Sequence, residues 1–130
     1  VIGFMNTLKL EGARSNIVIN ALAPLAATRI AEPSGIFDTY DPELVTTDAV
    51  AAMVTYLVSE DCTDTGNIVA ATAGYYSRIQ IVESEGVRID PRTEMTPDKI
   101  ADLWPQIHEM RNPQPYEDGV SNLTAVMAKE

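Results

Sequence analysis

Two short, nearly unbroken apolar runs constrain the fold of this 130-residue chain more than any other feature. The first is Ile17–Leu22 and the second is Asn67–Ala71, and each follows a helical pattern of apolar residues, at Val1–Glu11 and at Val50–Val58. Such runs are typical of parallel strands covered by helices on both faces. The order helix, strand, loop, helix, strand predicts an α/β fold with a parallel sheet and a right-handed crossover.

The ends of these elements have recognisable signals. The first helix is expected to end at Gly12 in the left-handed conformation, and Ala23-Pro24 is expected to end the first strand. Thr46 or Thr47 can cap the second helix, and Asp48 lies in its first turn, where a negative charge is favourable.

A sheet of two strands is marginal in water, so we expect further strands from sequence outside this chain or from another chain. The apolar helical pattern also begins at Val1 with no capping residue ahead of it. Both observations lead us to expect that the chain is part of a longer protein.

The pattern changes after Gly74. Tyr75–Val82 is compatible with an extended segment, and Thr96–Asp98 is a good helix start, with a capping Thr followed by Pro. Pro105 is expected to kink or divide that helix, and Val120–Met127 predicts a last short helix.

The composition excludes several classes of protein. Hydrophobic residues make up 45% of the chain and its formal net charge is -10, which disfavours nucleic acid and anionic membranes as partners. Cys62 is the single cysteine and His108 the single histidine, so no internal disulfide is possible and a metal site is not expected. These features predict a protein of a reducing compartment such as the cytoplasm.

The segments Val1–Leu8, Asn16–Pro24, Val50–Val58 and Gly66–Gly74, in this order and spacing, resemble the short-chain dehydrogenase/reductase family. The first two look like the helix that follows the family's active-site Tyr-x-x-x-Lys and the sixth strand of its nucleotide-binding sheet. The last two look like its final crossover helix and seventh strand. The implied fold is the C-terminal part of a Rossmann-like, doubly wound parallel sheet, containing its last two strands and flanking helices.

The rest of the chain, including Met95–Asp98, Leu103-Trp104 and the acidic tail, is similar to the 3-hydroxyacyl-CoA dehydrogenase domain of peroxisomal-type multifunctional enzymes and their bacterial relatives. The resemblance implies a division into residues 1–90, a portion of a dinucleotide-binding domain, and residues 91–130, a helical C-terminal extension.

The motifs that perform the family's chemistry are absent from this sequence. The residues four positions before its lysines do not include Tyr; the pairs are Met5 with Lys9, Met95 with Lys99, and Ala125 with Lys129. No two glycines are two residues apart, so a G-x-G phosphate loop is also absent. The resemblance therefore implies an NAD- or NADP-dependent oxidoreductase that acts on 3-hydroxyacyl or 3-oxoacyl thioesters, whose N-terminal half must complement this chain.

The candidate cofactor-binding residues follow from the same resemblance. Ligands of open α/β sheets bind outside the carboxyl ends of the strands. The family's loop at this position holds the nicotinamide end of the cofactor, which assigns that contact to Pro24, Leu25, Ala26 and Thr28. The alternative is an ordinary exit from a strand. The resemblance also implies that Arg29 and the loop 30–45 cover the substrate; the alternative is a solvated arginine in a poorly packed loop.

Other residues have a structural and a functional interpretation. Arg78, Arg88 and Arg92 are candidates for the phosphates of a CoA ester, although a solvated surface is the simpler explanation. Tyr75 and Tyr76 are expected to pack rather than to act as acid and base, because no Lys lies near them in sequence. No catalytic residue is therefore assigned.

A second class of function is a non-catalytic docking or oligomerisation module that uses an exposed apolar helix and a sheet edge. The resemblance itself implies a homo-oligomer, since the helix at Val1 lies at a subunit contact in the family. It also admits a peroxisomal location in a eukaryote beside the cytoplasmic one. A third interpretation is an acidic α/β domain with an unrelated small-molecule activity.

Overall fold

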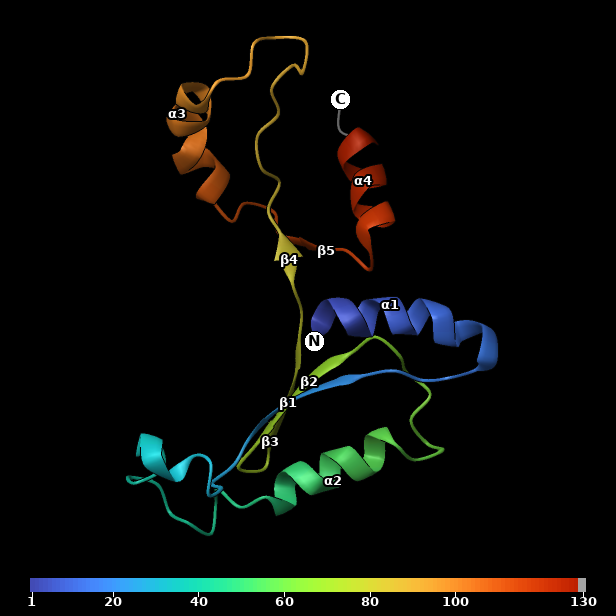
Figure 1. Cartoon of the computed structure of the whole chain (residues 1–130), viewed down its shortest axis with the longest axis vertical. Helices are drawn as coiled ribbons and strands as arrows, with labels where there is room; N and C mark the ends of the chain where they lie inside the picture. The colour runs from blue at the N-terminus through green and yellow to red at the C-terminus, as the bar shows by residue number, and fades with distance from the viewer. Residues whose placement is uncertain (129–130) are drawn as a thin grey trace. The chain divides into compact units, whose positions relative to one another are not determined.

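The computed structural model describes residues 1–128 of the chain. They form two compact units, which meet in sequence between Gln80 and Ile81. Figure 1 shows the helices and strands of each unit, and the two units are described separately below.

The first unit is built on a three-stranded sheet with the strand order β1-β2-β3. Strand β1 (Ala21–Leu25) pairs in parallel with β2 (Ile68–Thr72), from Ala21 opposite Ile68 to Leu25 opposite Thr72. Strand β3 (Tyr75–Ile79) pairs antiparallel with β2 on its other edge. The predicted α/β fold with its parallel strand pair is confirmed. The segment 75–82, which was compatible with an extended conformation, supplies β3 as a third strand of the sheet.

Strand β1 begins and ends later than the sequence predicts. Ladder pairing starts at Ala21 because β2 starts only at Ile68. Ile19, which precedes the strand, is bonded to the turn before β2 instead. Its amide donates to the Thr65 hydroxyl (3.0 Å), and its carbonyl accepts a hydrogen bond from the amide of Gly66 (2.7 Å). The expectation that Ala23-Pro24 ends the strand is also wrong. β1 is an edge strand of this sheet, where a missing N–H is tolerated.

Helices α1 (Ile2–Gly12) and α2 (Asp48–Leu57) cover opposite faces of this sheet, as Figure 1 shows. Met5 of α1 packs with Ala21 and Ile68 in the buried core. The second helix has Asp48 in its first turn, as predicted, whereas Thr47 occupies its N-cap position without a side-chain capping bond. In the described part of the chain, no helix is long and apolar enough to cross a membrane.

Helix α1 does not end on a left-handed glycine. Gly12 has φ -68°, the chain continues into a 3-10 turn at Ala13–Ser15, and Asn16 takes the left-handed conformation with φ 53°. Gly12 serves a different purpose, because a Cβ atom there would lie 3.1 Å from the carbonyl oxygen of Ile17 and 3.2 Å from its Cβ. The glycine allows the chain to fold back tightly onto the end of the helix.

A two-residue loop joins β2 to β3. Its residues are Ala73 with φ 46° and Gly74 with φ 75°. Positive φ at both positions is the signature of a type I′ hairpin turn, which matches the twist of the flanking strands. Gly74 suits this turn and Ala73 does not, since left-handed backbone is unfavourable for a residue with a Cβ atom.

The second unit contains α3 (Pro97–His108), α4 (Gly119–Ala128) and a small ribbon of β4 (Val82–Glu83) with β5 (Gln114–Pro115). The predicted start of α3 is confirmed, since the Thr96 hydroxyl accepts a hydrogen bond from the amide of Lys99.

Helix α3 is not divided at Pro105, which lies inside its continuous span. Between Ile81 and Ala128 no residue is buried. Polar contacts hold this part of the chain together, among them Arg111 with Glu85 at 3.6 Å and the Arg88 guanidinium with the carbonyl of Val126.

Candidate functional site

The two parallel strands of the first unit end at the same edge of the sheet. Leu25, the last residue of β1, lies opposite Thr72, the last residue of β2. In open α/β sheets this edge is where ligands bind. The segment that leaves Leu25 and returns to α2 at Asp48 is therefore in position to form a site.

A backbone hydrogen bond closes this segment into a loop. The amide of Ala27 donates to the carbonyl of Val45 at 2.7 Å, which joins the two ends of the loop. Val45 is buried, with 5% of its surface exposed. Between these ends, the carbonyl of Thr28 accepts hydrogen bonds from the amides of Ala31 (2.8 Å) and Glu32 (3.1 Å). Four residues at the start of the loop are therefore fixed by backbone contacts.

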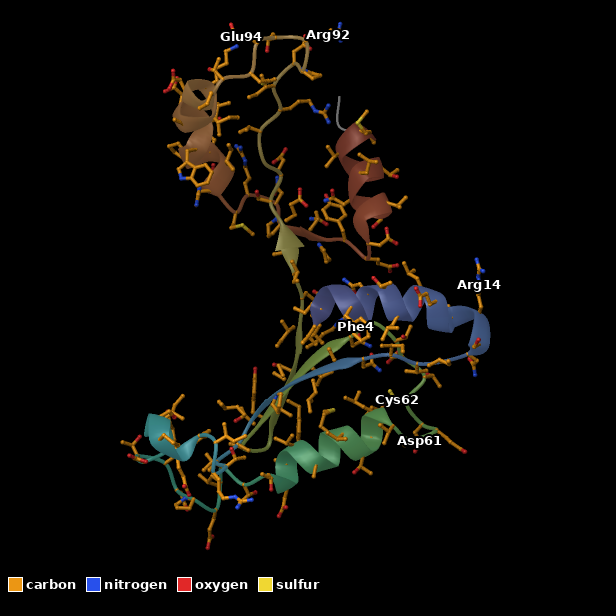
Figure 2. The ribbon with its side chains drawn as sticks, viewed as in Figure 1. Phe4, Arg14, Asp61, Cys62, Arg92 and Glu94 are labelled. Carbon is orange, nitrogen blue, oxygen red and sulfur yellow. The ribbon has the colours of Figure 1, made fainter. Side chains whose placement is uncertain are left out.

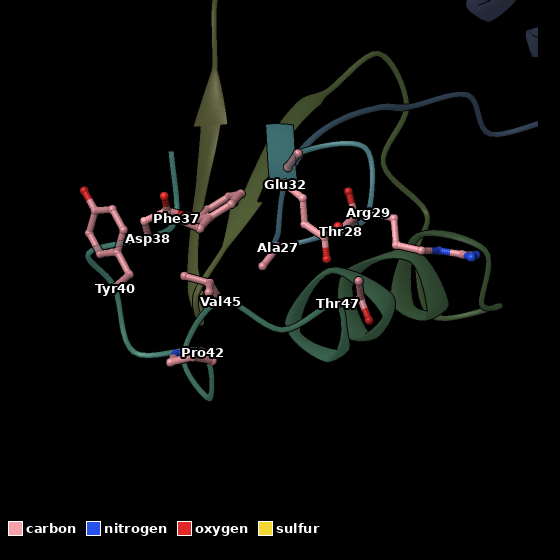
Figure 3. Close-up of a pocket in the computed structure, with 11 residues that line it drawn as sticks. Ala27, Thr28, Arg29, Glu32, Phe37, Asp38, Tyr40, Pro42, Val45 and Thr47 are labelled. Carbon is pink, nitrogen blue, oxygen red and sulfur yellow. The ribbon is translucent and has the colours of Figure 1, made fainter. Parts of the chain in front are cut away.

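The loop lines an open pocket of about 620 Å³, a volume typical of small-molecule sites. Every residue that lines the pocket comes from the segment 27–47. Figure 3 shows the Phe37 ring and Val45 facing Ala27 across the pocket. The side chain of Arg29 extends away from the aromatic residues, toward α2.

The structure separates the four predicted cofactor-binding residues. Pro24 and Leu25 belong to β1, where they pair with residues of β2, and Ala26 follows the strand directly. Of the four, only Thr28 lines the pocket. Its carbonyl is engaged in the turn, where it accepts the hydrogen bonds from Ala31 and Glu32. The cofactor contact of all four residues stays a prediction.

Several pocket residues were not singled out from the sequence. Phe37 and Tyr40 supply the aromatic surface, and Glu32 and Asp38 supply negative charge. These residues lie in a stretch without helical or strand periodicity, so no pattern marked the direction of their side chains. The one available signal is the presence of two aromatic residues in a segment otherwise rich in turn formers.

The three arginines considered for CoA phosphates do not form a cluster within either unit. Arg78 lies on β3 in the first unit, whereas Arg88 and Arg92 belong to the second. Arg92 makes an exposed ion pair with Asp90 at 3.3 Å, in the loop before α3 that is visible in Figure 2.

Tyr76 has the structural role that the sequence favoured. Its hydroxyl donates to the carbonyl of Ala49 at 2.9 Å and so ties β3 to the first turn of α2. The hydroxyl is thereby engaged with the backbone, and the absence of an acid or base role for Tyr76 stays a prediction.

The single cysteine and the single histidine each contact a neighbouring side chain. Cys62, which is 6% exposed, lies beyond the end of α2 (Figure 2), where its sulfur accepts a hydrogen bond from the Asn20 side chain at 3.7 Å. The ring of His108 makes an edge contact with Trp104, with 4.1 Å between the ring centroids. Among residues 1–128, no group of side chains has the composition and spacing of a metal site.

Sequence comparisons find relatives along nearly the whole chain. It is 33% identical over 131 residues to peroxisomal multifunctional enzyme A of Dictyostelium discoideum, an alignment that covers 98% of this chain and 28% of the relative. It is 34% identical over 113 residues to a Mycobacterium tuberculosis protein named as a short-chain type dehydrogenase/reductase, which covers 85% of this chain and 37% of the relative. The chain thus spans only a minor part of the relatives it matches. No protein-family model matches the sequence.

Solved structures agree with this relationship. Full-length peroxisomal multifunctional enzyme type 2 from Drosophila melanogaster superposes with a TM-score of 0.70 at 25% identity, over 97% of this chain and 22% of that one. A short-chain dehydrogenase from Mycobacterium avium shares the fold with a TM-score of 0.59, over 88% of this chain and 36% of the other. In sequence and in fold, the relatives of this chain are short-chain dehydrogenases/reductases and peroxisomal multifunctional enzymes, as the sequence predicted, and the chain corresponds to a fragment of such a protein.

Proposed function

We propose that this chain forms the substrate-side and nicotinamide-side wall of an NAD- or NADP-dependent short-chain dehydrogenase/reductase that interconverts 3-hydroxyacyl and 3-oxoacyl thioesters. The observation that carries the proposal is the closed loop at the carboxyl edge of the parallel pair β1 and β2, with its pocket and the hydroxyl of Thr28. The names of the relatives support the reaction class.

The residues at this edge fit the amide end of a nicotinamide. A carboxamide needs hydrogen-bond partners in a pocket that is otherwise apolar. Thr28 offers a hydroxyl that can both donate and accept, while Ala27 and Val45 offer apolar surface beside it. When bound, the cofactor supplies the hydride that is exchanged with the substrate carbon.

This chain's own contribution is to bind and orient. The loop fixes Thr28 through its backbone contacts, and it lies in position to cover the reacting groups from one side. The family's Tyr and Lys, which exchange the proton of the substrate hydroxyl, must come from complementary sequence because Tyr-x-x-x-Lys is absent here. The chain alone is expected to be inactive.

The test is a chimaera in which this chain replaces the matching segment of the Mycobacterium tuberculosis relative. The expected result is oxidation of the reduced nicotinamide nucleotide when a 3-oxoacyl-CoA is added. The reaction is measured as a decrease in the absorbance of that nucleotide. The isolated chain serves as the control without catalytic residues. A folded chimaera that binds neither nucleotide nor thioester would contradict the proposal.

The docking module remains a second candidate because of one observation on α1. Phe4 and Leu10 are exposed, at 69% and 57%, although the helix buries Met5 against the sheet. Exposed apolar side chains on a helix of this kind fit a contact with another subunit, including a second copy of the chain. If the purified chain is folded, binds no nicotinamide nucleotide and is unable to complement a catalytic half, the docking function gains support.

The compartment follows from the same relatives. Several of them are named as peroxisomal enzymes, so a peroxisome is the proposed location if the source is eukaryotic, and the cytoplasm otherwise. Fluorescent tagging of the complete protein in its own cell tests this assignment.

A further inference from the structure

Strand β3 has an open outer edge. The sheet has the strand order β1-β2-β3, and among residues 1–128 no strand pairs with the side of β3 that faces away from β2. An edge of this kind offers unpaired N–H and C=O groups to another strand, and proteins commonly protect it with Pro or Lys. The other edge strand, β1, contains Pro24. Strand β3 contains neither Pro nor Lys.

The hairpin turn determines which backbone groups of β3 point outward. Thr72 and Tyr75 flank the two-residue loop, so they form a hydrogen-bonded pair with each other. The pattern alternates along an antiparallel ladder, so the amides and carbonyls of Tyr76 and Arg78 point away from β2. These groups are available to a second strand.

The side chains of β3 divide between the two faces of the sheet, since alternate residues of a strand point to opposite faces. The Tyr76 hydroxyl reaches the carbonyl of Ala49, so Tyr76 and Arg78 lie on the face covered by α2. The other face of the strand, toward α1, carries Tyr75, Ser77 and Ile79.

The charge of this region favours a second copy of the chain as the partner. The formal net charge of -10 opposes self-association through most of the surface, because like charges repel. Between residues 65 and 82, however, the only charged side chain is that of Arg78. Two copies can therefore approach each other along β3 without opposing carboxylates.

The sequence of β3 is also complementary to itself. When two β3 strands run antiparallel about a two-fold axis at Ser77, Arg78 of each copy lies opposite Tyr76 of the other. A guanidinium beside an aromatic ring is a favourable pair. On the other face, Tyr75 lies opposite Ile79, and aromatic residues pair well with β-branched ones across a sheet.

We propose that β3 pairs antiparallel with β3 of a second copy, centred on Ser77, and so joins two three-stranded sheets into one. The outward amides and carbonyls of Tyr76 and Arg78 then form hydrogen bonds with each other across the two copies. This surface is distinct from the exposed apolar residues of α1, and the pairing does not depend on the proposed reaction.

Sedimentation equilibrium of the complete 130-residue chain over a range of concentrations tests the association, and we expect a reversible dimer. Arg78→Pro removes an outward amide that makes no bond to β2, so it should abolish the dimer and leave the circular dichroism spectrum unchanged. Ser77→Lys places two like charges at the two-fold axis and should weaken the dimer by about fivefold. Phe4→Ala, at an exposed position of α1, is the control and should leave the affinity unchanged.

Cross-linking tests the register of the pairing. In a Cys62→Ala background, Ser77→Cys places two thiols opposite each other at the axis, where oxidation by diamide should join the copies through a disulfide. Tyr75→Cys is the matched control, because the two introduced thiols then lie opposite Ile79 and far from each other. Adding Ile79→Cys to Tyr75→Cys should restore the cross-link.

Several outcomes overturn the inference: a chain that stays monomeric at every concentration, a dimer that Arg78→Pro leaves intact, or a cross-link through Tyr75→Cys but not through Ser77→Cys. Loss of the dimer in Phe4→Ala would assign the association to α1 instead. The proposed function is judged separately by hydride transfer in the chimaera, which does not require two β3 strands to pair.

Discussion

The amide of Ala27 and the carbonyl of Val45 are 2.7 Å apart, so one hydrogen bond joins the two ends of the loop that follows β1. The contact brings the start of the loop, with Thr28, next to its end, just before α2. The side chain of Val45 is buried beneath this closure. Together the bond and the buried side chain account for a defined pocket in a segment that contains only a short 3-10 turn at Glu32–Ser34.

Replacing Val45 with Ala is expected to lower the free energy of unfolding by about 1–3 kcal/mol, because buried methyl groups are removed and a cavity remains. The loop should also open more often, so the Ala27 amide should exchange with deuterium faster. Denaturant titration and hydrogen exchange measure the two effects. Val58→Ala is the control, since Val58 is 79% exposed and its loss should change stability by less than about 0.5 kcal/mol.

Met5 provides the corresponding test of the core between α1 and the sheet. It is 4% exposed and packs against Ala21 of β1 and Ile68 of β2. Met5→Ala is expected to lower the free energy of unfolding by about 2–5 kcal/mol. Leu10→Ala on the exposed part of the same helix should cost much less. Similar losses in both variants would show that the packing of α1 differs from that described.

Much of this fold was predictable from sequence, because apolar periodicity reports burial directly. The parallel pairing of β1 with β2 and the helix that begins at Asp48 followed from such patterns. The exact start of β1 was not predictable. The strand begins at Ala21 because this residue lies opposite Ile68, where β2 begins, and not where the apolar run begins.

The site was less predictable than the fold. The carboxyl edge could be located from the order of elements, and Thr28 was identified there through the family resemblance. Phe37 and Tyr40 could not be placed, because the conformation of a loop without periodicity depends on long-range contacts such as the bond from Ala27 to Val45.

The hairpin between β2 and β3 contains a residue that is unfavourable for its conformation. Ala73 has φ 46° in a turn that favours Asn or Asp at this position. Ala73→Asn is therefore expected to raise the free energy of unfolding by about 0.5–1 kcal/mol. Gly74→Ala, at φ 75°, should lower it by about 1–2 kcal/mol. Thermal and denaturant unfolding measure both, and a stabilised Gly74→Ala variant would refute the turn geometry.

The hydrogen bond from the Tyr76 hydroxyl to the carbonyl of Ala49 can be tested by removing a single oxygen atom from the side chain. Tyr76→Phe should lower the free energy of unfolding by about 0.5–1.5 kcal/mol, at the lower end because the side chain is partly exposed. Tyr75→Phe, on the adjacent residue, should change it by less than about 0.5 kcal/mol. In the active chimaera neither variant should alter the pH profile of hydride transfer, whereas a changed profile for Tyr76→Phe would assign it a role in proton exchange.

Thr28 offers the corresponding test of the cofactor contact. Thr28→Val keeps the shape of the side chain and removes its hydroxyl. In the active chimaera the loss of one neutral hydrogen bond, about 0.5–1.5 kcal/mol, should raise the KM for the nicotinamide nucleotide by about 2- to 13-fold. Thr55→Val is the matched control, because the Thr55 hydroxyl binds the carbonyl of Ala51 within α2 and lies outside the pocket. If Thr28→Val raises only the KM for the thioester, the hydroxyl contacts substrate, and the nicotinamide contact assigned to Thr28 is wrong.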